Sequence, residues 1–336
     1  MRPSGDRLLP LVHSYFVEHL QRVRGASRHT VRAYGHALRL FLLFLADRLH
    51  RHVADLKLDD IQADAVLAFL DHVELVRRNC PSTRNCRRAA IRGFVEHLLR
   101  HDVSRAGQYQ RILAIQPKRA RMRQVTYWEP EVVTSILAQP DRKTPLGRRD
   151  HALLLFLYNT GARVSEALAV RAQDLHLARP CHVRLLGKGA KERICPIWSD
   201  TAKALAPLLA CGEHQNDVVF RSSRGNPLSR DGVAYALRKH VRQAAGTHPI
   251  LRRAPATPHV LRHSCAVALL QAGVDLTVIR DYLGHASVAT TNRYVATNLQ
   301  MKRRVIEAFW QRAGLRGGRE HSWRPKPDLI RFLSSL

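Results

Sequence analysis

Three short segments bring together residue types that can act on a phosphate ester. They read Thr160-Gly161-Ala162-Arg163-Val164-Ser165-Glu166, then His259-Val260-Leu261-Arg262-His263-Ser264, then Leu283-Gly284-His285, and Tyr294 follows. Attack on a phosphodiester concentrates negative charge on the non-bridging oxygens, and arginine holds such oxygens through forked, permanently charged donors. A tyrosine hydroxyl can attack phosphorus when a nearby group, such as an imidazole, accepts its proton. These residue types suit transesterification of a phosphodiester.

A lysine at the tip of a predicted hairpin adds a proton donor. Residues 182–186 and 193–197 are predicted as short strands, joined by a loop that carries Lys188. Lysine can donate a proton to a leaving oxygen, whereas the pKa of arginine is too high for ready donation. Lys191 is an alternative for this role. The loop is not a P-loop, because a second glycine at the required spacing and the Lys-Ser/Thr pair are missing.

Capping residues place the histidine and arginine candidates on a helix. Thr257-Pro258 supplies an N-cap and a first-turn proline for a predicted helix over 259–272, which Gly273 ends. His259 and Arg262 are three residues apart and therefore share a face.

Two further predicted helices lead to the tyrosine. Asp275 begins one that ends at Gly284, and Ser287 caps the next, which carries Tyr294. Upstream of them, an apolar helix over 150–158 ends near Gly161, and a second helix starts after it.

The first 107 residues have helical periodicity. Apolar residues recur at three- and four-residue steps over 27–45, and similar patterns cover 61–76 and 82–99. The other faces of these helices carry arginines that either meet solvent or grip phosphates, namely Arg28, Arg32, Arg39, Arg87, Arg88 and Arg92. The sequence does not separate these two interpretations.

Domain limits follow from where the periodicity changes. The pattern loosens over 108–125, where Lys118-Arg119-Ala120-Arg121-Met122-Arg123 suits either an exposed connector lying against phosphates or a merely soluble linker. We therefore predict a helical domain over 1–107, a basic linker over 108–125, a second domain over 126–315 and a basic tail over 316–336.

The charge of the chain favours a polyanionic partner. Its 336 residues include 55 Lys and Arg against 27 Asp and Glu, a net charge of +28, and such a field attracts nucleic acid. The longest apolar runs are too short to span a membrane, and no secretory signal is evident. We expect a cytoplasmic protein with no membrane partner.

A metal site is the less favoured interpretation of the histidines and cysteines. His259 and His263 stand four residues apart with His285 further on, but Val260 occupies the position where a zincin pattern places glutamate. Cys80 and Cys86 lack a paired C-x2-C spacing, and the six cysteines are interpreted as free thiols.

These motifs resemble those of the tyrosine recombinase (phage-integrase) family, and in particular the XerC/XerD-like site-specific recombinases. The family's catalytic arginine, lysine, histidine, arginine, histidine or tryptophan, and tyrosine occur in this order. The matching positions here are Arg163, Lys188, His259, Arg262, His285 and Tyr294. The intervals of 3, 23 and 9 residues from His259 to Tyr294 are typical of the family. The match is strong over 127–314 and weaker before it.

The resemblance implies a fold, an activity and roles. The fold would be mainly α with a small β-sheet, comprising a helical, SAM-like core-binding domain and an α+β catalytic domain. Tyr294 would form a covalent 3′-phosphotyrosyl link in double-stranded DNA target sites, with no cofactor and no metal. Lys188 is the predicted general acid and His259 the candidate base, while His285 would hydrogen-bond the phosphate. Glu166 would support a basic partner.

Assembly and alternatives complete the sequence-based expectations. By resemblance, the protein would act as a tetramer on synapsed DNA or with a paired recombinase, for integration, excision or resolution. Residues 301–313 form either a helix that docks on a neighbouring subunit or one that covers its own core. The alternatives are a type IB topoisomerase-like enzyme that nicks and closes DNA, and a non-catalytic DNA-binding accessory protein.

Overall fold

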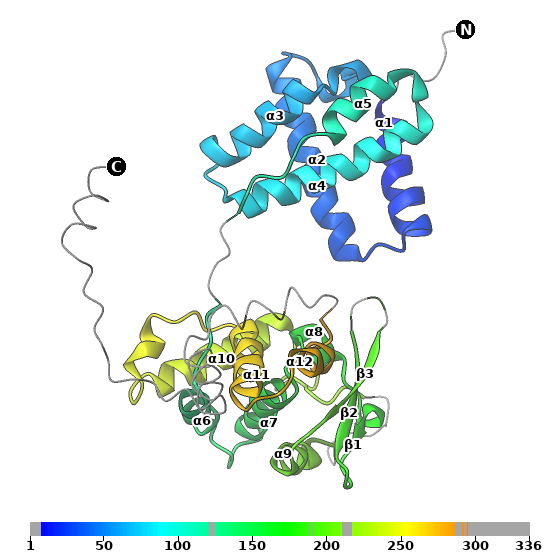
Figure 1. Ribbon diagram of the computed structural model, residues 1–336. Coiled ribbons are helices and arrows are strands. Elements are labelled where there is room, and N and C mark those ends of the chain that lie inside the picture. The colour runs from blue at the N-terminus through cyan, green and yellow to red at the C-terminus, as the bar shows by residue number, and fades with distance from the viewer. Residues whose placement is uncertain are drawn as a thin grey trace, which may run out of the picture. The chain divides into compact units, whose positions relative to one another are not determined.

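The computed structural model describes residues 8–120, 125–187, 189, 191–209, 217–285, 291 and 294. The chain divides into two compact units, Met1–Met122 and Arg123–Leu336, which Figure 1 shows. Helices dominate both units, and the described strands form one small antiparallel sheet in the second unit. The predicted fold class is therefore confirmed. In the described residues, no helix is long and apolar enough to cross a membrane.

The first unit is a helical bundle around an aromatic core. Its principal elements are α1 (Leu8–Ser14) with a π-helical continuation (Tyr15–Val23), α2 (Arg28–Arg48), α3 (Ala63–Asp71) with a π-helical turn (His72–Val76), α4 (Pro81–His101) and α5 (Ala106–Leu113). Short 3-10 turns cover Val53–Asp55, Leu58–Asp60 and Val103–Arg105. Ser27 caps α2 by accepting a hydrogen bond from the Thr30 amide. Phe41, Phe69 and Phe94 are fully buried between the helices.

The segment after α5 is held against α4 by side chains. Arg88 and Arg92 donate to the carbonyls of Ile115 and Leu113, both at 2.6 Å, so these two arginines bind backbone and do not simply face solvent. The Lys118 ammonium lies 2.7 Å from the Glu74 carboxylate. Helix α5, whose Tyr109 and Ile112 are buried, occupies part of the predicted linker 108–125.

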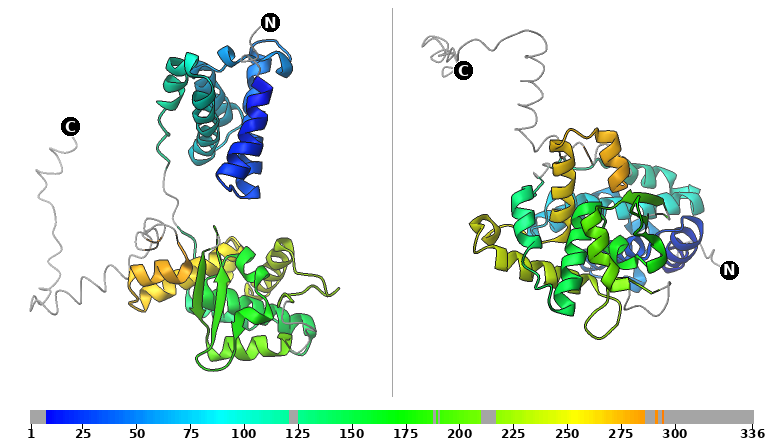
Figure 2. Two further views of the ribbon diagram at one scale, coloured as in Figure 1. Left: turned by 90° about the vertical axis from the view of Figure 1, so that its right-hand side faces the viewer. Right: turned by 90° about the horizontal axis from the view of Figure 1, so that it is seen from below.

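The second unit consists of helices packed beside the sheet. Its helices are α6 (Pro130–Leu137), α7 (Pro145–Thr160), α8 (Val164–Ala169), α9 (Ser199–Leu209), α10 (Arg230–Ala244), α11 (Pro258–Gln271) and α12 (Leu276–Leu283), with 3-10 turns at Ala172–Asp174 and Pro249–Arg252. The central helix α7 is buried along most of its length and contacts α9 and α11. Figure 2 shows α11 (gold) next to α12 (orange), which pack against each other.

The sheet has the order β1 (Leu175–His176), β2 (His182–Leu186), β3 (Glu192–Pro196), all antiparallel. Val183 pairs with Cys195 and Leu185 with Arg193. Val183, Leu185 and Cys195 are buried in the core, whereas the intervening β2 residues Arg184 and Leu186 are exposed. β2 contacts α8, which follows Arg163, and β3 contacts α12, which precedes His285.

Most predicted helix boundaries agree with the structure to within a few residues. Helix α11 starts at Pro258 after Thr257, although the Thr257 side chain makes no capping hydrogen bond. Asp275 caps α12 through the Thr277 amide, and Gly284 ends it with φ +64°. The prediction missed α9, α10 and the short strand β1, and it began α7 five residues too late, because Thr144 is the N-cap of that helix.

Candidate active site

Five of the six predicted catalytic residues line one cleft of the second unit. The cleft has a volume of about 180 Å³ and is lined by Val125, Arg163, His259, Arg262, His263, His285 and Tyr294. The residues come from the start of α8, from α11, and from the segment that follows α12. Since one water molecule takes about 30 Å³ of liquid volume, the cleft has room for a phosphate group.

Arg262 is buried beneath the cleft and joins two helix ends. Its guanidinium donates to the carbonyl of Gly161 at 2.5 Å and to that of Leu283 at 2.7 Å, and the residue is 4% exposed. These carbonyls lie at the C-terminal ends of α7 and α12, where helix dipoles favour a cation. Burial and the neighbouring Arg163 lower the pKa of Arg262 to about 10, so it stays charged at neutral pH.

Arg163 is oriented by a buried carboxylate. Glu166, one turn further along α8, receives hydrogen bonds from the Arg163 guanidinium at 2.6 Å and from the Arg163 amide at 2.9 Å. Arg193 of β3 binds the same carboxylate at 2.7 Å. Burial alone would raise the pKa of Glu166, but the hydrogen bonds from Arg193 and Arg163 outweigh it and lower that pKa. Glu166 therefore supports a basic partner, as its sequence position suggested.

Two histidines of the cleft, His259 and His285, favour the neutral form. Burial and the charges of Arg262 and Arg163 lower the pKa of His285 to about 4 and also lower that of His259. His285 Nδ1 lies 3.0 Å from the hydroxyl of Thr291, a fully buried residue. This contact connects the end of α12 to the segment that carries Tyr294.

Tyr294 is buried and lines the cleft. The residue is 2% exposed and packs in a hydrophobic cluster with Cys265, Ile279 and Leu283. Its hydroxyl oxygen lies 3.0 Å from Nδ1 of His263. All these contacts lie within the second unit, so the folded helices of that unit fix the position of the tyrosine.

The sequence identified most of the cleft but overlooked two residues. Lys188 and the helix cap Ser287 lie outside the described residues, as do residues 301–313 and the tail 316–336. Arg193 and His263 were given no catalytic or supporting role. The sequence does contain a signal for His263, because it follows His259 by four residues and so shares its helical face. The sequence analysis interpreted this spacing only as a possible metal-binding pattern.

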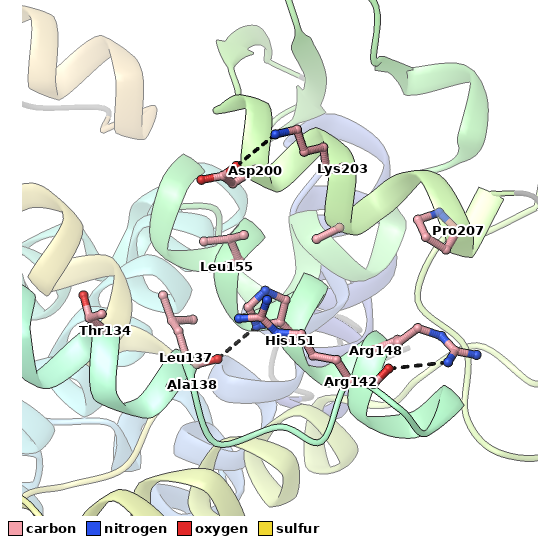
Figure 3. A pocket seen from close by; sticks show the side chains of 11 residues that line it. Thr134, Leu137, Ala138, Arg142, Arg148, His151, Leu155, Asp200, Lys203 and Pro207 are labelled. Atoms are coloured by element: carbon pink, nitrogen blue, oxygen red, sulfur yellow. Dashed lines mark hydrogen bonds and ion pairs between the residues drawn. The ribbon is translucent and has the colours of Figure 1, made fainter.

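A larger hollow lies elsewhere in the second unit, between α6, α7 and α9. Its volume is about 550 Å³, and Figure 3 shows its lining, which includes Leu137, Leu155, Pro207 and the half-buried His151. Nδ1 of His151 lies 2.9 Å from the Leu137 carbonyl oxygen. No cluster of three or more histidine, cysteine or acidic side chains suited to a metal occurs among the described residues.

Two family models match the chain in succession. The model "Phage integrase, N-terminal SAM-like domain" matches residues 14–103, and the model "Phage integrase family" matches residues 126–301.

Curated relatives cover nearly the whole chain. A putative integrase/recombinase, y4rC, of Sinorhizobium fredii is 38% identical over 98% of both chains. Tyrosine recombinase XerD of Halalkalibacterium halodurans is 34% identical over 88% of this chain and 96% of its own.

Solved structures share the fold. The XerH site-specific recombinase bound to a palindromic difH substrate, in a post-cleavage complex, matches with a TM-score of 0.66 at 22% identity, over 88% of this chain and 84% of its own. The Tn1549 transposon integrase in complex with transposon right end DNA matches with a TM-score of 0.64 at 14% identity, over 88% and 98%. At these identities the likeness shows the fold alone.

The family match, together with the helical unit and its basic cleft, identifies the chain as a tyrosine recombinase. Enzymes of this class break and rejoin DNA strands. The chain belongs to the phage integrase family. The resemblance inferred from its motifs is thereby confirmed.

Proposed function

We propose that the protein recombines specific DNA sites through Tyr294. Its hydroxyl attacks the scissile phosphate, which forms a 3′-phosphotyrosyl link and releases a 5′-hydroxyl. Attack by the 5′-hydroxyl of a partner strand then reverses the step. Because the link conserves the bond energy, strand rejoining requires no nucleotide cofactor.

One observation carries this proposal. Arg163, Arg262, His259 and His285 line the same cleft as Tyr294. The two arginines of this cleft can supply the positive charge that stabilises the non-bridging oxygens of the phosphate in the transition state.

The remaining roles follow from where the side chains lie. Arg163 and Arg262 hold the non-bridging oxygens of the phosphate. His259, at the exposed edge of the cleft, and His285 donate hydrogen bonds to the same group. Lys188, from the hairpin between β2 and β3, protonates the leaving 5′ oxygen. His259 was also the predicted base for the proton of the Tyr294 hydroxyl.

The partners that we propose are double-stranded target sites and further recombinase subunits. The net charge of +28 supports binding to the DNA backbone. Four subunits, either identical or including a paired recombinase, would hold two sites and exchange one pair of strands and then the other.

The test is a single-turnover cleavage assay. Nicked suicide duplexes that tile the DNA flanking the gene are incubated with the protein, and covalent protein–DNA adducts are separated on denaturing gels. We expect an adduct on a restricted set of duplexes, and we expect it to vanish in Tyr294→Phe. Tyr158→Phe, a substitution of a partly buried tyrosine in the same unit, should retain it.

The alternatives give different results. Relaxation of any supercoiled plasmid, with adducts spread over unrelated sequences, would favour a topoisomerase-like enzyme. DNA binding without an adduct on any tiled duplex would contradict the enzymatic proposal and favour an accessory protein.

A further inference from the structure

The position of His263 suggests a role for a residue outside the predicted catalytic set. His263 lies on α11, immediately after Arg262 and four residues after His259. Its Nδ1 is 3.0 Å from the Tyr294 hydroxyl oxygen, and the two ring centroids are 5.5 Å apart. This distance is that of a direct hydrogen bond to the atom that attacks phosphorus.

His259 lies one helical turn before His263 on the same face of α11. Its ring centroid is 6.4 Å from that of His263, in a stacked arrangement, and its side chain is at the exposed edge of the cleft. His285 stacks against Tyr294 with centroids 6.1 Å apart, while its Nδ1 is engaged with Thr291. Of the three imidazoles in the cleft, His263 is therefore the one with a hydrogen bond to the tyrosine hydroxyl.

We infer that His263 accepts the proton of the Tyr294 hydroxyl during attack and returns it during rejoining. This inference rests on the proposed function, since it assigns the proton acceptor of that reaction. His263 thereby takes the role of base that was predicted for His259. His259 keeps only its proposed contact with the phosphate.

The proton balance of the step is simple. With the ring proton of His263 on Nε2, the tyrosine donates its hydroxyl hydrogen to Nδ1. As the bond from Oη to phosphorus forms and the bond from phosphorus to the 5′ oxygen breaks, this proton moves to Nδ1 and gives an imidazolium. The leaving oxygen takes a proton from Lys188, and rejoining reverses both transfers.

The charges around the cleft fit this direction of transfer. The cations Arg163 and Arg262 and the histidines His259 and His285 face the same space as His263. The neutral form of an imidazole is the form that can accept a proton. A bound phosphodiester brings a negative charge that offsets the arginines and so favours the imidazolium formed in the reaction.

The experiment combines two substitutions. His263→Asn places an amide near the position of Nδ1, which can hydrogen-bond the tyrosine but cannot take its proton. We expect it to bind DNA as the unmodified chain does and to form adduct about 100-fold more slowly, within the range of general base catalysis. Its rate should also rise more steeply with pH, because the phenol must then lose its proton to solvent.

The second substitution replaces Tyr294 by difluorotyrosine, whose phenol is more acidic. If His263 takes the proton, this change should restore most of the rate lost in His263→Asn and should alter the chain with intact His263 much less. His151→Asn is the matched control, because Nδ1 of His151 also contacts an oxygen, in the hollow shown in Figure 3. It should cleave at the unmodified rate.

Two results would overturn the inference. Cleavage by His263→Asn within about twofold of the unmodified rate would exclude a catalytic part for the imidazole. Equal effects of difluorotyrosine in both backgrounds would reduce His263 to a positioning residue. If His263→Asn fails to fold, judged by circular dichroism, His263→Gln takes its place under the same criteria. Absence of adduct with the unmodified chain would instead contradict the proposed function itself.

Discussion

At the scale of single residues, the cleft combines side chains with both structural and chemical roles. Arg262 holds the ends of α7 and α12 through two carbonyls and also lines the cleft. Glu166 orients Arg163 and Arg193 at the same time. Such sharing means that loss of one side chain changes the shape of the site as well as its charge.

Histidine burial makes the stability of the first unit depend on pH. His97 is 3% exposed and packs against Tyr15, His19 and His101. Burial, followed by the charges of its neighbours, lowers its pKa to about 4. Between that value and the unfolded pKa of about 6.5, the unfolded chain binds a proton that the folded chain does not. This contribution to stability is therefore lost as the pH falls.

We predict that His97→Gln makes the decline of Tm between about pH 7 and about pH 5 shallower. Thermal unfolding followed by circular dichroism at a series of pH values measures this decline. The exposed His13→Gln should keep the profile of the unmodified chain. Parallel profiles for all three proteins would show that the titration of His97 does not contribute.

At the scale of elements, helix ends were predictable where capping residues mark them. Thr257-Pro258, Asp275 and Gly284 delimit α11 and α12 as predicted. Helix α10 was missed although Ser229 caps it. Many of its residues are polar, so its apolar residues do not stand out as a helical repeat in the sequence. The strand β1 has two residues and depends on pairing with β2, so no local pattern indicates it.

The residues of the candidate site that lie in local sequence motifs could be predicted, and those outside such motifs could not. Arg163, His259, Arg262, His285 and Tyr294 occupy motifs with fixed spacing, and the fold brings them to one cleft. Arg193 lies on β3 and reaches Glu166 across 27 residues of sequence. A contact of this kind arises from tertiary packing, and nothing near Arg193 distinguishes it from the other arginines of a chain that has 46.

Gly161 ends α7 under two constraints. Its φ is +56°, and a Cβ atom there would lie 2.4 Å from a methyl carbon of Leu283. We predict that Gly161→Ala lowers the free energy of unfolding by about 1–3 kcal/mol, from backbone strain and from the displaced Leu283. It should also slow cleavage, because Arg262 binds the carbonyls of both residues.

Urea unfolding and the adduct assay test this prediction. Gly225→Ala is the matched control, since its φ of +77° imposes the same backbone strain but its Cβ would have open space. A loss of stability in Gly161→Ala no larger than in the control would mean that contact with Leu283 costs nothing.

The hairpin of β2 and β3 contains, in sequence, the proposed acid Lys188. The Gly187 amide donates to the Lys191 carbonyl at 2.8 Å and closes its base. We predict that Lys188→Ala slows cleavage strongly on ordinary DNA but far less on DNA with a 5′-bridging phosphorothiolate, whose sulfur leaves without a proton. Rates of adduct formation on the two substrates measure the difference, and Lys191→Ala is the control. Equal losses on both substrates would remove Lys188 from this role.

At the scale of the whole molecule, the chain consists of two units, each with its own hydrophobic core. The residues of the cleft come from the second unit alone, while the first has its own core and its own aromatic packing. Both units contribute to the excess of basic residues, so contacts with the phosphate backbone can extend along a site beyond the point of cleavage.

Tyr294 is buried among residues of its own unit. This burial has a consequence for assemblies in which two different variants of the chain are mixed. Because His263, Arg262 and Tyr294 come from one polypeptide, each subunit would cleave with a nucleophile of its own. We predict that Tyr294→Phe and Arg262→Ala chains, mixed on one target, fail to complement each other. Adduct yield from the mixture should equal the sum of the two inactive proteins. Recovery of cleavage would mean that a tyrosine is donated between subunits, and the nucleophile would then have to leave the packing that holds it here.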